Sequence, residues 1–137
     1  MQASTRFADA IHIMTYIYVR QNLPDLSSKT LAFSVNTSSV TIRQITSQLS
    51  KAGLLNTRKG SKKVSLTKDP KEISLYEIFL AISTGQVFKR DENTSITCQI
   101  GQQMPNIIDH VFNDIEDTVK AKLKTMTLDD VIKQVQL

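Results

Sequence analysis

The segment 36–70, NTSSVTIRQITSQLSKAGLLNTRKGSKKVSLTKDP, constrains the fold of this chain more than any other stretch. Its first half places apolar residues at helical spacing, and Thr37 or Ser38 can accept the hydrogen bond that caps a helix. Gly53 then interrupts the pattern, as glycine does at many helix C-termini. The segment is therefore predicted to open with a helix whose first turn carries short hydroxyl side chains.

Two short strands are predicted directly after this helix. Residues 54–57 and 64–67 are short apolar strings, and the alternation in VSLT at 64–67 is typical of a half-buried strand. The run RKGSKK at 58–63 lies between them. The pattern indicates a β-hairpin with a cationic tip.

Three further helices are predicted on either side of this segment. One covers residues 5–20, a short one begins near residue 28, and another covers residues 75–82. Pro24 separates the first two because proline cannot continue a helix. The order of three helices, a hairpin and a helix is that of a winged helix-turn-helix domain, so the fold class is predicted as mainly α with a small β-hairpin wing.

The C-terminal part carries the pattern of a long amphipathic helix, which Gly101 and Pro105 introduce and which continues to about Lys124. An apolar stripe of this length has too little of its own chain to cover it. We therefore expect a second copy of the protein as its partner, rather than a helix that is satisfied internally. The expected interface residues are Met104, Ile108, Val111, Phe112, Ile115 and Val119.

The predicted organisation has three parts. Residues 1–84 form the winged helix-turn-helix domain, 85–100 a polar connecting loop, and 101–137 the dimerisation helix followed by a C-terminal helix. Thr127 and Asp130 have the spacing of a capping-box variant, which places the start of that last helix.

Charge is divided unequally along the chain. Residues 1–67 hold nine Lys and Arg against two Asp, whereas residues 68–137 hold eight Lys and Arg against eleven Asp and Glu. The first half is thus strongly basic and the second half is acidic. This division indicates that the first half meets a polyanion, although a solvated surface with a chance imbalance would give the same counts.

A hydroxyl-rich helix ahead of a basic hairpin fits double-stranded DNA. Such a helix presents its N-terminal residues to base edges in the major groove, while the hairpin lies on the backbone or in the minor groove. The expected contacts are Ser38, Ser39, Thr41, Arg43 and Gln44 from the helix, Arg58, Lys59, Lys62 and Lys63 from the hairpin, and Arg6 on the DNA backbone. The alternatives are that the hydroxyls only cap the helix and that the lysines form a solvated tip.

The sequence contains few features that would indicate another class of function. We see no phosphate-binding glycine loop, no Ser–His–acid grouping and no metal-ligand spacing, so neither a catalytic nor a metal site is predicted, and we do not expect an enzyme. No run approaches the ~18 apolar residues of a membrane span. A single cysteine fits a reducing cytoplasm.

The chain resembles the Rrf-two family of bacterial transcriptional regulators, the group that includes IscR, NsrR and CymR. The matching segments are STRFADAIHIM, VTIRQITSQLSKAGLLNTRKG, EISLYEIFLAIS, CQIG and LKTMTLDDVI. The resemblance covers essentially the full length, and it implies a winged-helix domain with a dimerisation helix that crosses onto the partner subunit. The expected function is a cytoplasmic, homodimeric, sequence-specific DNA-binding regulator that represses transcription from a near-palindromic operator.

Two departures from the family pattern matter. Lys59 and Gly60 occupy the place of an arginine–glycine pair that often precedes the wing tip, so the wing is expected to contribute mainly charge, and insertion into the minor groove is left open. Iron–sulfur members place three cysteines ahead of the long helix, whereas this chain has only Cys98. A cluster needs three or four protein ligands, so we expect no cofactor and a likeness to cluster-free relatives.

Cys98 allows two interpretations. The positive end of the long helix would favour its thiolate, which suggests a one-cysteine redox switch. Alternatively, it is a small buried apolar residue.

Two rival accounts of the whole protein stay open. The chain could be a winged-helix protein-interaction module, or adaptor, that has no specific DNA readout. A small ligand between the first domain and the long helix could also control DNA binding.

Overall fold

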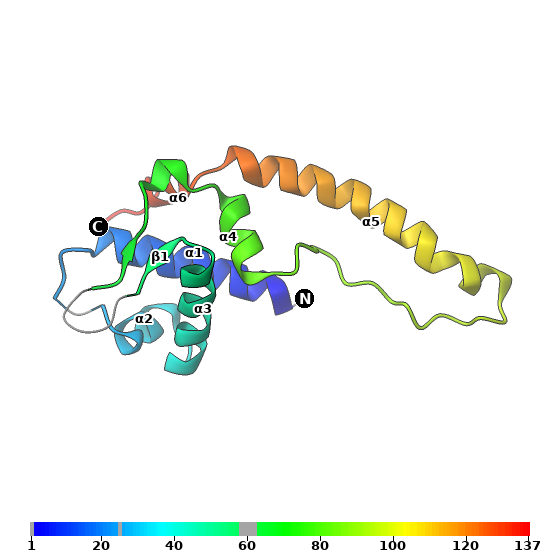
Figure 1. The fold of residues 1–137 in the computed structure, drawn as a ribbon, viewed down its shortest axis with the longest axis horizontal. Coiled ribbons are helices and arrows are strands. Elements are labelled where there is room, and N and C mark those ends of the chain that lie inside the picture. The colour runs from blue at the N-terminus through cyan, green and yellow to red at the C-terminus, as the bar shows by residue number, and fades with distance from the viewer. Residues whose placement is uncertain (1, 25, 58–62) are drawn as a thin grey trace.

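The computed structural model describes residues 2–24, 26–57 and 63–137. The elements are α1 (Gln2–Val19), α2 (Ser28–Val35), α3 (Ser39–Lys51), β1 (Leu55–Asn56), β2 (Ser65–Leu66), the 3-10 turn η1 (Pro70–Glu72), α4 (Leu75–Ile82), α5 (Gln99–Thr125) and α6 (Leu128–Ile132). The first part of the chain folds into a head, and α5 projects from it as a long arm (Figure 1). The predicted fold class is confirmed, and among the described residues η1 is an element that the sequence pattern did not predict.

Serine side chains set the starts of α2, α3 and α4 in the head. Each accepts a hydrogen bond from a backbone N–H in the first turn, which satisfies a donor that has no partner within the helix. These caps are Ser27 for α2, Ser38 for α3 and Ser74 for α4. In contrast, α1 begins at Gln2, three residues before the predicted start at residue 5.

The end of α3 fixes where the hairpin begins. Gly53 has a φ of +79°, its N–H donates to Ser50 O at 3.0 Å, and the N–H of Leu54 donates to Leu49 O at 3.0 Å. This pair of bonds is the Schellman motif, in which a left-handed residue closes a helix. The hydroxyl of Thr67 then donates to Gly53 O at 2.7 Å and ties the far strand to the same turn.

The wing is an antiparallel pair in which Leu55 lies opposite Leu66 and Asn56 opposite Ser65. Each strand has two residues, so the strands are shorter than the four-residue strings in the sequence. Leu55 is buried and attaches the hairpin to the core. The tip at 58–62 lies outside the described residues.

Side chains from α1, α2, α3, α4, β1 and α6 share one apolar core. Leu128 of α6 is fully buried in it, although it lies near the end of the chain. The backbone of this region is bonded to the start of α4, with Leu128 N–H donating to Ile73 O and Leu75 N–H donating to Met126 O, both at 2.9 Å. The domain division at residue 84 stays a prediction, but α6 belongs to the same core as α1.

The predicted capping box at the start of α6 is confirmed. The Thr127 hydroxyl accepts from the N–H of Asp130, and the Asp130 carboxylate accepts from the N–H of Thr127. Throughout the described ranges, no helix combines the length and the hydropathy that crossing a bilayer requires.

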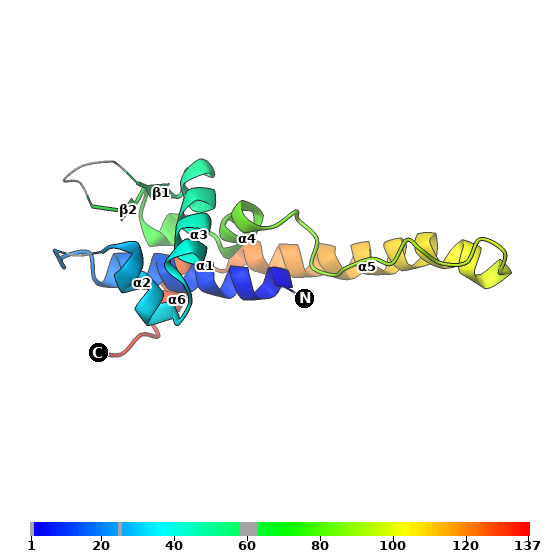
Figure 2. The same cartoon turned by 90° about the horizontal axis from the view of Figure 1, so that it is seen from below.

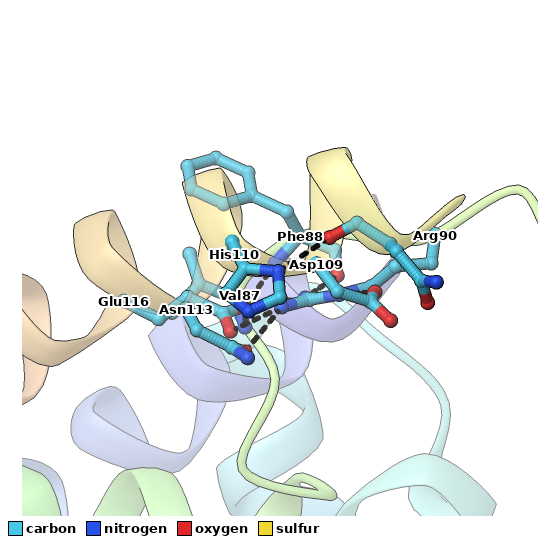
Figure 3. Close-up of polar contacts among 8 residues, drawn as sticks. Val87, Phe88, Arg90, Asp109, His110, Asn113 and Glu116 are labelled. Atoms are coloured by element: carbon cyan, nitrogen blue, oxygen red, sulfur yellow. Dashed lines mark hydrogen bonds and ion pairs between the residues drawn. The ribbon is translucent and has the colours of Figure 1, made fainter. Parts of the chain in front are cut away.

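The connection between α4 and α5 runs outward along the arm before α5 returns to the head (Figures 1 and 2). Glu116 of α5 holds it there with a carboxylate that is only 2% exposed. Its Oε2 accepts from the N–H groups of Val87 at 2.6 Å and Phe88 at 2.9 Å. The Arg90 guanidinium bonds both carboxylate oxygens at 2.9 Å, and Figure 3 shows these groups converging on Glu116.

This clamp lowers the pKa of Glu116. Hydrogen bonds from Arg90, and then from the N–H groups of Phe88 and Val87, favour the ionised carboxylate and bring its pKa to about 2, against an opposing effect of burial. The loop is therefore held by a charge that persists at all but strongly acidic pH.

We expect Gly53→Ala to lower the free energy of unfolding by about 1–2 kcal/mol, because an L side chain resists positive φ. No atom lies within 4 Å of the added Cβ, so the cost comes from the backbone alone. Gly53→Asn is the matched control, since Asn36 already adopts a φ of 61° at the end of α2. Urea unfolding followed by circular dichroism measures both variants, and an equal loss for Asn would contradict strain as the cause.

We expect the loop to detach from α5 in acid. The pKa of Glu116 is lower in the folded protein than in the unfolded chain, so its stabilisation is complete above about pH 4.5 and is lost as the pH falls toward 2. Glu116→Gln should reduce hydrogen-exchange protection of the Val87 and Phe88 amides about ten- to a hundredfold at neutral pH. Asp117→Asn, an exposed change on the same helix, is the control. Protection that is insensitive to both acid and Glu116→Gln would show that the carboxylate does not hold the loop.

Candidate nucleic-acid interface

The rotation of α3 about its own axis is set by three apolar side chains. Ile42, Ile45 and Leu49 are each 0% exposed and point into the core. The opposite face of the helix is therefore turned to solvent. Its exposed residues are Val40, Arg43, Gln44, Ser47 and Lys51.

The sequence prediction covered only the first turns of this outward face. Arg43 and Gln44 are exposed as expected, whereas Ser47 and Lys51 were missed. Val40 belongs to the apolar residues of this segment, yet it is 55% exposed. Val40 lies two positions before Ile42, which places it about 200° around the helix from that buried residue. Helical periodicity counted from Val40 therefore predicts the exposed row, which is Val40, Arg43, Gln44, Ser47 and Lys51.

One hydroxyl group at the start of α3, that of Ser38, caps the helix. Ser38 Oγ accepts from the N–H of Thr41 at 3.1 Å and lies 3.0 Å from Thr41 Oγ1. Ser38 is exposed, whereas Ser39 and Thr41 are partly buried. The capping interpretation therefore holds for Ser38, and a DNA contact by any of the three stays a prediction.

A hollow of about 520 Å³ opens along this face of α3. Arg6 reaches it from α1, where Nη2 donates to Gln48 Oε1 at 2.9 Å and Nη1 to Gln44 Oε1 at a longer 3.5 Å. The full lining is Arg6, Val40, Arg43, Gln44, Ser47, Gln48 and Lys51, which includes three cations and no acid. The sequence predicted Arg6 only as a contact to the DNA backbone and did not indicate Gln48.

The cationic wing is described only in part. Lys63 is exposed just before β2, whereas Arg58, Lys59 and Lys62 lie outside the described residues. The contribution of the wing to DNA binding stays a prediction.

The expected dimer stripe on α5 divides into two faces. Val111 and Ile115 are 47% and 43% exposed, and Ile107, at 47%, extends the same row. Phe112, in contrast, packs against Phe88 of the connecting loop with ring centroids 5.0 Å apart. The loop therefore covers the Phe112 side, and the other expected interface residues, Met104, Ile108 and Val119, are partly buried.

Cys98 caps the start of α5 and is exposed, so its interpretation as a small buried residue is wrong. Its Sγ accepts from the N–H of Gly101 at 3.4 Å. Hydrogen bonds from the backbone of Gly101, and then of Ile100, lower the pKa of the thiol. The redox switch itself stays a prediction.

Comparison with known proteins places these features in a family. The model of the Rrf2 family, described as an iron-dependent transcriptional regulator, matches residues 3–134. YwnA of Bacillus subtilis strain 168, provisionally named an HTH-type transcriptional regulator, is 35% identical over 130 residues, which are 94% of this chain and 96% of YwnA.

Solved structures have the same fold. A crystal structure of a protein provisionally described as DNA-binding is 35% identical, with a TM-score of 0.71 over 93% of this chain and 98% of its own. The oxidized form of Staphylococcus aureus CymR, 22% identical, has a TM-score of 0.70 over 100% of both chains. With a family model that spans nearly the whole sequence and relatives at 35% identity, the chain belongs to the Rrf2 (Rrf-two) family of transcriptional regulators.

Proposed function

We propose that this protein is a homodimeric repressor that reads a near-palindromic operator by inserting α3 into the major groove of DNA. One observation carries the proposal: the buried row Ile42, Ile45 and Leu49 turns a polar and cationic row outward. A protruding α-helix fits the major groove, where each base pair presents a distinct pattern of donors and acceptors. Membership of a family of transcriptional regulators supports this assignment.

The outward residues of α3 have chemistry that suits base edges. Arg43 can donate to O6 and N7 of guanine, Gln44 can bond base edges, and exposed Val40 suits the methyl group of thymine. Lys51 and Lys63 are exposed, and we assign them to phosphate attraction, which supplies affinity without sequence preference. We assign the same role to Arg58, Lys59 and Lys62 of the wing tip.

The dimer would form through the uncovered side of α5. The row Ile107, Val111 and Ile115 is exposed, while the connecting loop occupies the neighbouring Phe112 side. Pairing of two such helices about a twofold axis would bury both rows. It would also set the two α3 helices at half-sites about one helical turn of DNA apart, or a multiple of that.

The family description names iron, and the donors of this chain do not fit an iron–sulfur cluster. The sequence has one cysteine, and among the described residues no three His, Cys, Asp or Glu are grouped so that they could hold a metal. A cluster needs three or four ligands. We therefore propose a regulator that works in the cytoplasm without a cluster and without catalytic activity.

The adaptor hypothesis makes a different prediction from the repressor hypothesis. An adaptor would bind DNA weakly and without sequence preference, whereas a repressor discriminates among fragments at fixed salt concentration. A mobility-shift titration against genomic fragments, repeated at two salt concentrations, separates the two.

We expect Arg43→Ala to weaken binding by about 1–3 kcal/mol on some operator variants and little on others, because a base contact is lost. Lys63→Ala is the comparison: it should weaken all sequences alike and reduce the slope of log K against log salt by about 1. Fluorescence anisotropy with a panel of single-base operator variants measures both. Equal loss on every sequence for Arg43→Ala would remove Arg43 from the readout.

We expect Val111→Glu to convert the dimer to a monomer, since it places two charges within an apolar interface. Asn106→Glu adds the same charge to an exposed position on another face of α5 and should leave the dimer intact. Sedimentation velocity reports the assembly, and anisotropy should show that operator affinity falls with the dimer. A wild-type monomer, or a Val111→Glu dimer, would refute this interface.

A further inference from the structure

Arg6 is joined to the outward face of α3 from a distant part of the sequence. Its guanidinium lies in the hollow along that helix, 2.9 Å from Gln48 Oε1 and 3.5 Å from Gln44 Oε1. The bond to Gln48 is short and charge-assisted, whereas the one to Gln44 is weak at that length. Of the two glutamines, Gln48 is therefore the one whose side-chain orientation Arg6 restricts more strongly.

The chemistry of the two groups fixes which way the amide of Gln48 faces. A guanidinium has only donors, and a carboxamide has one acceptor oxygen and a nitrogen that only donates. The oxygen must therefore face Arg6, and the amide nitrogen is left on the other side. The bond from Arg6 therefore favours the orientation in which Gln48 turns its N–H donors away from Arg6.

This orientation has a consequence for base readout. A freely rotating glutamine prefers adenine, because it accepts from N6 and donates to N7 at the same time. The oxygen keeps a second lone pair, but when it faces Arg6 the edge of the amide turned away from Arg6 carries the two N–H donors. That edge then matches base edges rich in acceptors, which are N7 and O6 of guanine and O4 of thymine.

Building on the proposed function, we propose that Arg6 is a positioning residue that sets the base preference of α3. By holding the amide oxygen of Gln48, and more weakly that of Gln44, it directs their nitrogens outward and favours guanine or thymine over adenine at the base pair facing Gln48. The competing account is that Arg6 leaves the glutamines and contacts a phosphate.

The first test uses the full-length protein without DNA. We expect Arg6→Ala to shift the side-chain amide resonances of Gln48 in ¹⁵N NMR spectra and to increase the mobility of that side chain. Gln103, exposed on α5, is the internal control and should not change. Unchanged Gln48 resonances would overturn the proposal before any DNA is added.

The second test selects binding sites from randomised duplexes with wild type, Arg6→Ala and Arg6→Lys. We expect Arg6→Ala to lose about tenfold of the discrimination against adenine at the position facing Gln48, with other positions unchanged. Arg6→Lys should fall between the two, because an ammonium can bond one amide oxygen but lacks the fork that reaches two. It also provides the comparison if Arg6→Ala folds poorly, which thermal melting reports.

A double-mutant cycle shows whether Arg6 acts through Gln48. Gln48→Ala should lose the preference at the same position, and adding Arg6→Ala to it should change that preference no further. Independent effects of the two substitutions would overturn the positioning role.

The remaining outcomes separate this inference from the proposed function. If Arg6→Ala weakens every sequence alike and reduces the salt slope, Arg6 is a phosphate contact and the inference fails. If wild type selects a site and the Arg6 variants select the same one, the inference fails alone. If wild type selects no site, the proposed function fails.

Discussion

The burial of Ile42, Ile45 and Leu49 is the interaction on which the candidate DNA-binding surface depends. These side chains pack into a core built by α1, α2, α4, β1 and α6, and a helix with three apolar anchors has only one rotation that buries them all. That rotation determines which side chains of α3 face the solvent on the opposite side. The chemistry that faces solvent is thus decided by residues buried in the core, so the stability of the head and the geometry of the proposed DNA-binding surface are linked.

A second constraint acts on the arm. Glu116 neutralises Arg90 and accepts two backbone N–H groups, so the connecting loop stays on one side of α5. Phe112 packs against Phe88 on that side, whereas Ile107, Val111 and Ile115 stay exposed. The apolar stripe in the sequence is therefore divided between an intramolecular contact and an exposed row. The buried charge of Glu116 therefore determines which apolar residues of α5 stay exposed.

Local signals in the sequence were sufficient for most of the elements. Thr37 or Ser38 and the pair Thr127–Asp130 were predicted as caps, and the structure confirms Ser38 and that pair because capping depends on contacts within one helical turn. Hydrophobicity alone did not determine which residues stay exposed. Val40 is apolar yet 55% exposed, and Cys98, for which a buried site was one interpretation, is exposed as well.

The sequence by itself determined the order of the elements, the caps, the turn at Gly53 and the basic character of the first half, since each depends on neighbouring residues or on composition. Only the tertiary structure decided that Arg6 contacts Gln48, that α6 completes the core of the head and that Glu116 clamps the loop to the arm. These contacts join residues that are far apart along the chain. Their geometry is set by how several helices pack around one core, which no local pattern encodes.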